Sequence, residues 1–266
     1  MAEPGPYTRL DSSEVPDPSQ RPTDWDYDRF LWLIEQLRKY RYDDAHIYRE
    51  YPYLIKDVFF SAILVAANAA LLDLADVAGA SSETRGQLAR WLDRGRAGLT
   101  SRFDAQAGLC ADYDIRAGED IRLRTFAGFA PLFARTPDPG QCAAQLRLLD
   151  SADFCGHPRL RWPLLPSTSP AEPAFEPHNY WRGPVWPVIN WLLWQSLHLL
   201  GYSARADAFR DNSLSQLAAA GEFGEYFEPF TGKQLGSTRQ SWTAAVTLDW
   251  LTSDRDAEEA EAPSGT

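Results

Sequence analysis

The sequence HNYWRGPVWPVINW, which runs from His178 to Trp191, decides the fold of this 266-residue chain. Its apolar second half continues to Leu200; Pro184 suits a first helical turn, and Gly201 suits the position after the last. A helix over 184–200 would be apolar on nearly every side, which predicts that it is buried. The turn at Gly183 would gather four side chains at the start of that helix: Tyr180, Trp181, Arg182 and Trp186.

Aromatic walls with one cation are typical of a pocket that binds sugar rings, because tryptophan and tyrosine combine a flat apolar face with a polar edge. A loop packed beneath its own helix would produce the same cluster. We expect a sugar site, because a purely structural scaffold has no need of an aromatic cluster at the start of a helix.

Helical periodicity dominates on both sides of this stretch, and strand-like patterns are confined to 109–113 and 121–123. Apolar helices among amphipathic ones favour an all-α fold with two concentric rings of helices, although an irregular bundle would give the same pattern. The predicted helices are 25–40, 54–79, 82–99, 126–134, 141–149, 184–200, 204–220 and 242–251.

The composition of the two ends predicts the limits of the helical domain. Residues 1–23 are rich in proline, serine and aspartate, so we expect an extended N-terminal segment. Residues 254–266 are acidic and contain little apolar surface, which predicts a disordered tail. The helical domain is therefore expected over residues 24–253.

Charge and motif content exclude several classes of partner. A formal net charge of −11 is unsuited to nucleic acid or to an anionic membrane surface. The apolar run 59–72 is shorter than the roughly 20 residues that cross a bilayer, so we expect a buried helix there and a cytoplasmic protein. No histidine or cysteine pair has metal-ligand spacing, so no metal or cofactor is expected. Homo-oligomerisation stays open. The three cysteines are predicted to be reduced core thiols: Cys110, Cys142 and Cys155.

Two further segments combine aromatic and polar residues. The first, GEYFEPFTG over 224–232, places two carboxylates among aromatic rings, and an extended backbone would direct Glu225 and Glu228 to opposite faces. A carboxylate buried among aromatic rings is costly unless it has a partner or a function, so Glu225 is a candidate catalytic residue. The second, RQSWTAA over 239–245, brings Gln240 and Trp242 to the start of the last helix.

The segments NYWRGPVWPVINW, GEYFEPFTG and QSWTAA, in this order, resemble glycoside hydrolase family sixty-three. The earlier stretches DPSQRPTDWDYDRFLWLI and YPYLIKDVFFSAILVAAN are most similar to its bacterial glucosylglycerate hydrolases, which are related to mannosylglycerate hydrolases. The resemblance extends from about Tyr7 to Leu251. It implies an (α/α)6 toroid of twelve helices, of which this chain would hold about seven or eight.

The resemblance also implies a reaction. An inverting glycoside hydrolase would cleave an α-glucosyl or α-mannosyl glycerate, one carboxyl group protonating the leaving oxygen while the other activates a water from a distance of roughly 6.5–9.5 Å. The family's general base falls on Glu225, and Glu228 takes a supporting role. The arginine at position 21 suits the glycerate carboxylate, because guanidinium binds carboxylates in a bidentate manner. The implied substrate-binding residues are Arg21, Tyr27, Tyr180, Trp181, Gly183, Trp186 and Gln240, with Arg182 and Trp242 in support.

One departure from the family pattern concerns the general acid. In the family it is an aspartate in a Gly-x-Asp-Asn-Ser-Pro-like motif, which these 266 residues do not contain; Asp211-Asn212-Ser213 has no proline after it. We therefore expect either a fragment of a longer enzyme or a truncated homologue, with weak or no hydrolysis by this chain alone. Two alternatives stay open: a sugar-binding module without turnover, and a trehalase-like or oligosaccharide α-glucosidase.

Overall fold

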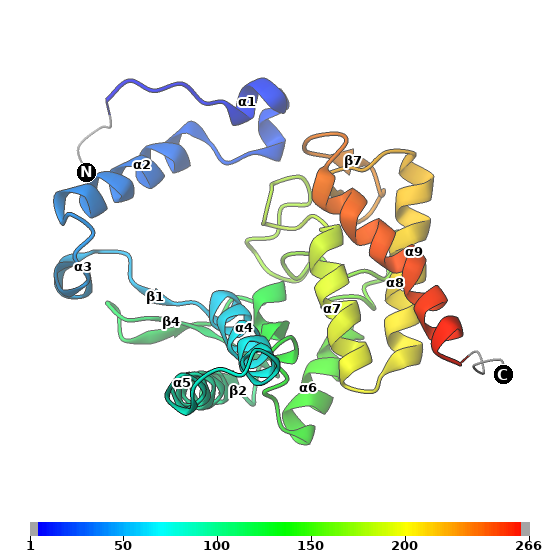
Figure 1. Cartoon of the computed structure of the whole chain (residues 1–266). Helices are drawn as coiled ribbons and strands as arrows, with labels where there is room; N and C mark the ends of the chain where they lie inside the picture. The colour runs from blue at the N-terminus through cyan, green and yellow to red at the C-terminus, as the bar shows by residue number, and fades with distance from the viewer. Residues whose placement is uncertain (1–4, 262–266) are drawn as a thin grey trace. The chain divides into compact units, whose positions relative to one another are not determined.

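A computed structural model describes residues 5–261, and helices supply most of the regular structure (Figure 1). Within this range, seven of the eight predicted helices are present as α-helices, and two short ones, α1 and α3, were not predicted. The helices are α1 (Asp11–Glu14), α2 (Asp24–Lys39), α3 (Asp44–Glu50), α4 (Val58–Val77), α5 (Ser82–Thr100), α6 (Pro139–Leu149), α7 (Pro187–Leu199), α8 (Ser203–Ala220) and α9 (Ser241–Glu261), with 3₁₀ turns η1 (Pro18–Gln20) and η2 (Phe126–Leu132). The strands are β1 (Ile55–Lys56), β2 (Phe103–Asp104), β3 (Leu109–Cys110), β4 (Asp112–Asp114), β5 (Glu119–Ile121), β6 (Tyr226–Phe227) and β7 (Gln234–Leu235).

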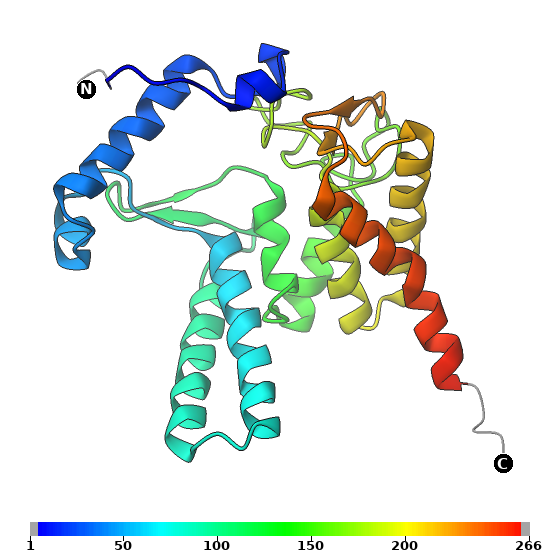
Figure 2. The ribbon, with the colours of Figure 1, turned by 45° about the horizontal axis from the view of Figure 1, so that its top comes forward.

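Two antiparallel helices, α4 and α5, lie side by side and are joined by a short turn (Figure 2). Asp57 caps α4 by accepting a hydrogen bond from the Phe60 N–H at 2.7 Å, and Ser81 caps α5 through the Thr84 N–H at 3.1 Å. The helices approach closely where Gly95 faces Val65, since a Cβ on Gly95 would lie 2.5 Å from the Val65 side chain. A residue without a side chain therefore sets the spacing of this pair.

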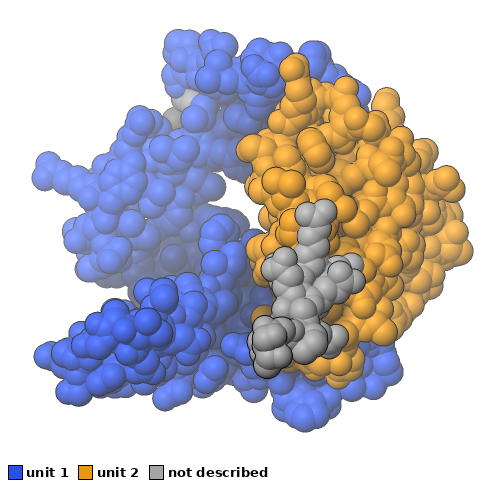
Figure 3. All heavy atoms as spheres, turned by 45° about the vertical axis from the view of Figure 1, so that its right-hand side comes forward, with its two compact units in different colours: residues 1–148 blue, residues 149–266 orange. Residues whose placement is uncertain are grey.

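The chain forms two compact units, residues 1–148 and residues 149–266, which Figure 3 colours blue and orange. The first unit contains α1 to α5, η1, η2 and strands β1 to β5, together with most of α6. The second contains α7 to α9 and the hairpin β6–β7. Each unit has its own buried apolar residues.

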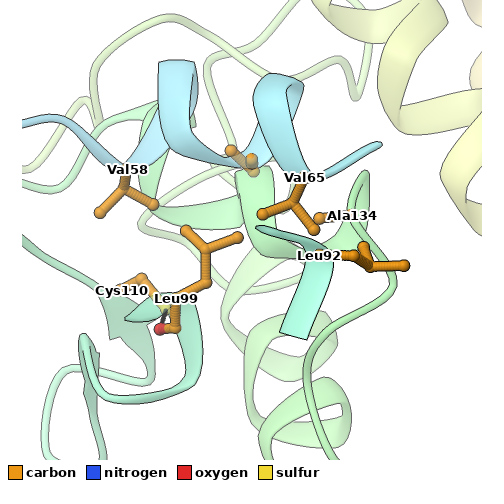
Figure 4. Packing of buried hydrophobic residues seen from close by; sticks show 8 residues of the cluster. Val58, Val65, Leu92, Leu99, Cys110 and Ala134 are labelled. Atoms are coloured by element: carbon orange, nitrogen blue, oxygen red, sulfur yellow. Dashed lines mark hydrogen bonds between the residues drawn. The ribbon is translucent and has the colours of Figure 1, made fainter. Parts of the chain in front are cut away.

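The apolar core of the first unit lies where α4, α5, β3 and η2 meet (Figure 4). Cys110 contributes a buried thiol, which donates a weak hydrogen bond to the Leu99 carbonyl. All three cysteines are buried and unbridged, which confirms their predicted core positions. The remaining members of the cluster are Val58, Ala62, Val65, Leu92, Ala130 and Ala134.

Helix α4 differs from the prediction of a buried helix. It runs for 20 residues, and by length and composition it is long and apolar enough to cross a membrane, a test that core helices also pass. One face is buried against α5 and η2, while Phe60, Leu64 and Val77 on other faces are exposed. The helix starts at Val58 instead of residue 54, because 55–56 form strand β1, which pairs with β4.

Other predicted boundaries in the first unit are also corrected by backbone geometry. The segment 126–134 forms a 3₁₀ turn, η2, because Pro131 lies inside it and cannot donate a backbone hydrogen bond. The predicted hairpin of 109–113 with 121–123 is instead divided: β4 pairs with β5, and β3 pairs with β2. The N-terminal segment contains α1 and η1 within its otherwise irregular backbone.

In the second unit, α7 packs against α8 and α9. Helix α7 is buried along most of its length, as the sequence predicts, and the described backbone of α9 continues to Glu261, beyond the predicted end at residue 251. Gly221 ends α8 in the left-handed region with φ of 72°, a conformation that glycine adopts without strain. Residues 262–266 of the predicted tail lie outside the described range.

The close approach of α4 and α5 yields a test of packing. We expect Gly95→Ala to lower the free energy of unfolding by about 1–3 kcal/mol, because its new methyl group would overlap Val65 in a packed interior. Urea denaturation of the purified chain measures this change.

The matched control is Gly98→Ala in the same helix, where an added Cβ meets nothing within 4 Å. There we expect a gain of roughly 0.5–1 kcal/mol from better helix propensity. Equal effects of the two substitutions would contradict the close-packing account.

Candidate functional site

An antiparallel bridge joins two of the three segments that are rich in aromatic residues, 178–191 and 224–232. The Val185 N–H donates to the Phe227 carbonyl at 2.8 Å, and the Phe227 N–H donates to the Val185 carbonyl at 2.9 Å. Val185 is extended instead of helical, because α7 begins at Pro187 and not at Pro184 as predicted. Pro187 therefore takes the first helical position, where the N–H that proline lacks would have no partner within the helix.

Buried polar side chains fix the backbone around this bridge. The Asn190 carboxamide accepts from the Leu165 N–H and donates to the Leu165 and Trp186 carbonyls, at 2.9, 3.2 and 3.1 Å. The Ser167 hydroxyl accepts from the Gly183 N–H at 2.9 Å. These bonds satisfy backbone groups that water cannot reach, so the loop before α7 has a defined path.

Trp186 lies at the centre of an aromatic cluster. Its ring stacks on Trp181 with a centroid distance of 3.7 Å and an interplanar angle of 7°, and on Tyr226 with 4.6 Å and 29°. The Trp186 indole N–H donates to the Tyr180 carbonyl at 3.1 Å, and its side chain is fully buried. The sequence predicts Trp186 as a substrate-binding residue, but the structure places it behind Trp181 and Tyr226.

Tyr180 and Trp181 are the partly exposed members of this cluster. The Tyr180 ring meets Trp181, Trp186 and Tyr226 edge-on, at centroid distances of 5.8, 5.2 and 5.8 Å. Its backbone has φ of 35°, which is unusual for a residue with a bulky side chain. Such local strain is maintained by surrounding packing and is concentrated at functional sites.

Glu225 lies next to the aromatic cluster, directly before strand β6. Its side-chain carboxylate accepts a hydrogen bond from the Ser237 N–H at 2.9 Å, and its own N–H donates to the Ser237 carbonyl at 3.0 Å. The residue is only 6% exposed. A carboxylate held by a backbone donor has a fixed position, which is what proton transfer to or from a bound molecule requires.

Gly236 makes room for this carboxylate. It has φ of 71°, and a Cβ at this position would lie 2.6 Å from Glu225 Oε2 and 2.6 Å from the Tyr226 ring. Position 236 therefore needs glycine both for its backbone conformation and for space.

Glu228, the second carboxylate of the segment, stabilises the hairpin turn. It accepts hydrogen bonds from the Phe230 N–H at 3.0 Å and from both the Thr231 N–H and hydroxyl. The side chain is buried, and all of these donors belong to its own turn. This local set of bonds is consistent with a supporting role.

The start of α9 completes the cluster. The Gln240 N–H donates to the Phe223 carbonyl at 2.7 Å, and the buried Thr243 hydroxyl donates to the Gly224 carbonyl at 2.8 Å. Trp242 meets Trp186 edge-on at 5.7 Å. The three segments 178–191, 224–232 and 239–245 are thus brought together within one unit (Figure 1).

Two predicted residues of the loop occupy different kinds of position. Arg182 is exposed and forms an ion pair with Glu176 at 3.0 Å. Gly183 is buried, and a Cβ there would lie 2.6 Å from the Glu176 carbonyl oxygen, so this glycine serves the backbone path. Arg182, the cation expected beside the aromatic residues, is therefore paired with Glu176 at the protein surface.

Arg21 and Tyr27 belong to the first unit, where they lie near a bidentate ion pair. Arg9 donates to both carboxylate oxygens of Asp11 at 2.7 and 3.1 Å, and its guanidinium carbon lies 3.9 Å from the centre of the Tyr27 ring. Burial and a hydrogen bond to Asp11 raise the pKa of Tyr27, while Arg9 and Arg21 hold the pKa of Asp11 below its usual range. A role for Arg21 and Tyr27 in substrate binding stays a prediction.

Four residues on which this geometry depends were not predicted from the sequence: Ser167, Asn190, Gly236 and Ser237. Only Gly236 had a visible signal, since an isolated glycine in a polar stretch is typical of a turn. Among the side chains that the structure describes, those of residues 5–253, no group of three His, Cys, Asp or Glu is placed to hold a metal ion.

Comparison with known proteins places these features in a family. The family model described as a mannosylglycerate hydrolase MGH1-like glycoside hydrolase domain matches residues 3–243. The chain is 43% identical over 245 residues to a glucosylglycerate hydrolase from Mycolicibacterium hassiacum, covering 92% of this chain and 55% of that protein. It is 40% identical to a mannosylglycerate hydrolase from Thermus thermophilus, covering 92% and 57%. The chain thus spans about half the length of these curated relatives.

Solved structures agree with the sequence relationship. A crystal structure of the family 63 mannosylglycerate hydrolase from Thermus thermophilus in complex with Tris and D-glycerate is 38% identical, with a TM-score of 0.85 over 93% of this chain and 57% of that chain. Neutral trehalase Nth1 from Saccharomyces cerevisiae shares the fold alone, with 14% identity and a TM-score of 0.54. These relatives confirm the predicted fold class, that of the helical (α/α)6 glycosidases. The chain therefore belongs to the MGH1-like glycoside hydrolases of family 63.

Proposed function

We propose that this chain supplies the general base and the sugar-binding wall of an inverting hydrolase that acts on an α-glucosyl or α-mannosyl glycerate. The observation that carries the proposal is the position of Glu225, a buried carboxylate beside the Trp181–Trp186–Tyr226 stack. Relatives that share about 40% of its sequence are named as hydrolases of these two compounds.

The base role requires Glu225 to remove a proton from a water that attacks the anomeric carbon. A carboxylate accepts that proton well when it is ionised and fixed in place. The Ser237 N–H holds one carboxylate oxygen of Glu225, which leaves its orientation set before substrate arrives. Glu228 is assigned no proton transfer, because its Oε2 accepts three hydrogen bonds that hold the hairpin turn.

The sugar-binding role falls mainly on Tyr180 and Trp181, the partly exposed aromatic residues. An aromatic face packs against the apolar C–H face of a sugar ring. Trp186 is assigned a supporting role, because its two ring faces are covered by Trp181 and Tyr226. Gly183 likewise supports the loop backbone.

The acceptor end of the substrate is assigned to Arg21, Tyr27 and Gln240. A guanidinium group binds a carboxylate through two parallel hydrogen bonds, which suits the glycerate acid group. The general acid is assigned to none of the 266 residues, since they contain no Gly-x-Asp-Asn-Ser-Pro-like motif.

The first test is glucose release from glucosylglycerate by the longest reading frame that contains this sequence. We expect Glu225→Gln to lower turnover by about 10²–10⁴-fold, because an amide cannot accept the proton from water. Binding of the substrate, measured by calorimetry, should persist in the variant.

Glu176→Gln provides the control, since Glu176 is an exposed carboxylate that pairs with Arg182. Its turnover should match that of the unchanged enzyme. If the Glu225→Gln enzyme were fully active, Glu225 could not be the general base. The 266-residue chain assayed alone should release little glucose, and rapid release by it would mean that its own residues include the general acid.

Gly236→Ala tests whether the position of Glu225 matters. The added methyl group would contact Glu225 Oε2 and Tyr226, so we expect a fall in turnover of at least tenfold, with little change in the affinity of the enzyme for the substrate. Gly221→Ala is matched in backbone, because Gly221 has φ of 72° and open space around it. Both changes should cost about 1–2 kcal/mol of stability for the left-handed backbone, Gly236→Ala should lose about 1–3 kcal/mol more through steric overlap, and only Gly236→Ala should affect turnover.

Arg21→Ala tests the nature of the acceptor. Loss of a charge-assisted pair should raise the KM for glucosylglycerate by at least tenfold, while hydrolysis of a glucoside with a neutral acceptor such as glucosylglycerol should be unchanged. Steady-state kinetics on both substrates measure the difference. An equal loss on both would argue against recognition of an acidic acceptor by Arg21.

A further inference from the structure

A groove of about 640 Å³ lies between α4 and α5 in the first unit. Phe60 and Leu64 line its α4 side, and Trp91 lines its α5 side. These three apolar side chains are 71%, 61% and 49% exposed, although the two helices pack against each other (Figure 2). Apolar side chains spaced three or four residues apart on a helix form a stripe that another helix can cover. The groove is therefore a candidate interface.

Asn68, a polar residue, lies in the same groove near the middle of α4. It is only 6% exposed, and none of the residues that the structure describes forms a hydrogen bond with its side chain. A buried amide without a hydrogen bond is unfavourable, because it has lost water and gained no partner. A carboxamide has both donors and an acceptor, so a second carboxamide can satisfy it through two reciprocal hydrogen bonds.

The sequence of α4 reads almost the same in both directions from Asn68. Residues 64–72 are LVAANAALL, in which two alanines and then two larger apolar residues lie on either side of Asn68. If two such helices pack antiparallel with their asparagines opposite each other, alanine faces alanine and Leu64 faces Leu72. Small residues at the crossing point allow a close approach, and the larger residues pack on both sides of it. The helix is thus self-complementary about Asn68.

We infer that two copies of this chain associate through α4, packed antiparallel about a two-fold axis at Asn68. The two Asn68 carboxamides donate to each other in the centre of the interface, and the exposed Leu64 and Leu71 side chains are covered by the other copy. With one α5 beside each α4, the assembly is a four-helix bundle. A single buried asparagine fixes the register of the pair, as it does in coiled coils. This inference goes beyond the proposed function and does not depend on it.

The charges at the two ends of α4 favour the antiparallel arrangement. Lys56 lies next to the first turn and lines the groove, whereas Asp73 and Asp76 are exposed near the last turn, Asp76 in an ion pair with Arg85. Antiparallel pairing brings Lys56 of each copy toward the acidic end of the other, where the helix carbonyl groups also carry negative charge. Asp57 lies at the Lys56 end too, but its carboxylate caps its own helix. Parallel pairing would place like ends together.

Sedimentation equilibrium of the purified 266-residue chain tests the association, and we expect a dimer. Leu64→Glu should weaken the dimer about 100-fold or more, because two charges would replace two apolar side chains in the interface. Leu199→Glu is the matched control, since Leu199 is 63% exposed, close to the 61% of Leu64, but lies on α7 in the second unit. The control should leave the dissociation constant unchanged.

Crosslinking tests the register. The three native cysteines are buried, so a cysteine introduced on α4 can be targeted with a short bismaleimide. Ala67→Cys should link two copies, because its two sites would be offset by only about 3 Å along the helix axes. Val77→Cys should not, because its sites would be offset by about 27 Å, although Val77 is 88% exposed. If Asn68→Leu is added, parallel pairs become possible, and Val77→Cys should link as well.

Several outcomes would overturn the inference. One is a monomeric chain, including a monomer that binds phosphatidylcholine vesicles through its apolar helix. Another is a dimer that Leu64→Glu and Leu199→Glu weaken equally, or that fails to link through Ala67→Cys. A monomer formed by a longer reading frame that contains this sequence would also overturn it, since residues outside the sequence would then cover the groove. An unchanged linking pattern in Asn68→Leu would reject the role of Asn68 in fixing the register.

Discussion

Two backbone hydrogen bonds between Val185 and Phe227 hold the candidate site together. Trp186 follows one bridge residue and Tyr226 precedes the other, so this pairing sets the distance between their rings, and Glu225 directly precedes Tyr226 at the start of strand β6. A shift of register by one residue would direct every side chain of the strand to the opposite face. The positions of the aromatic rings and of the Glu225 carboxylate thus depend on the pairing of Val185 with Phe227.

Much of this arrangement could be predicted from the sequence, and the reasons are physical. Helix α7 has apolar residues on nearly every side and Gly201 after its end, and this pattern predicted a buried helix. The aromatic residues before the helix predicted an aromatic cluster at its start. The position of Trp186 inside that cluster could not be predicted, because spacing along a loop does not reveal which ring faces are covered. The start of α7 was misplaced for a related reason: Pro184 and Pro187 both suit a first turn, and the bridge at Val185 decides between them.

The residues that the sequence analysis missed act through backbone geometry. Asn190 and Ser167 bind main-chain groups of segments that are distant in sequence, and no local pattern indicates such partners. Gly236 is required because Glu225 approaches it, which follows only from the hairpin register. The exposed faces of α4 were also unexpected, since a nearly uniform apolar composition predicts burial all round, whereas only the face toward α5 and η2 is covered.

The long sequence separation within the bridge also has a consequence for biosynthesis. The ribosome makes residues 178–186 well before it makes Phe227, and Ser237, the partner of Glu225, is made later still. Until Tyr226 has been made, Trp181 and Trp186 lack its ring, and a non-local pairing of this kind is slow to close. A nascent chain that pauses before Tyr226 therefore presents uncovered aromatic surface of the type that promotes aggregation.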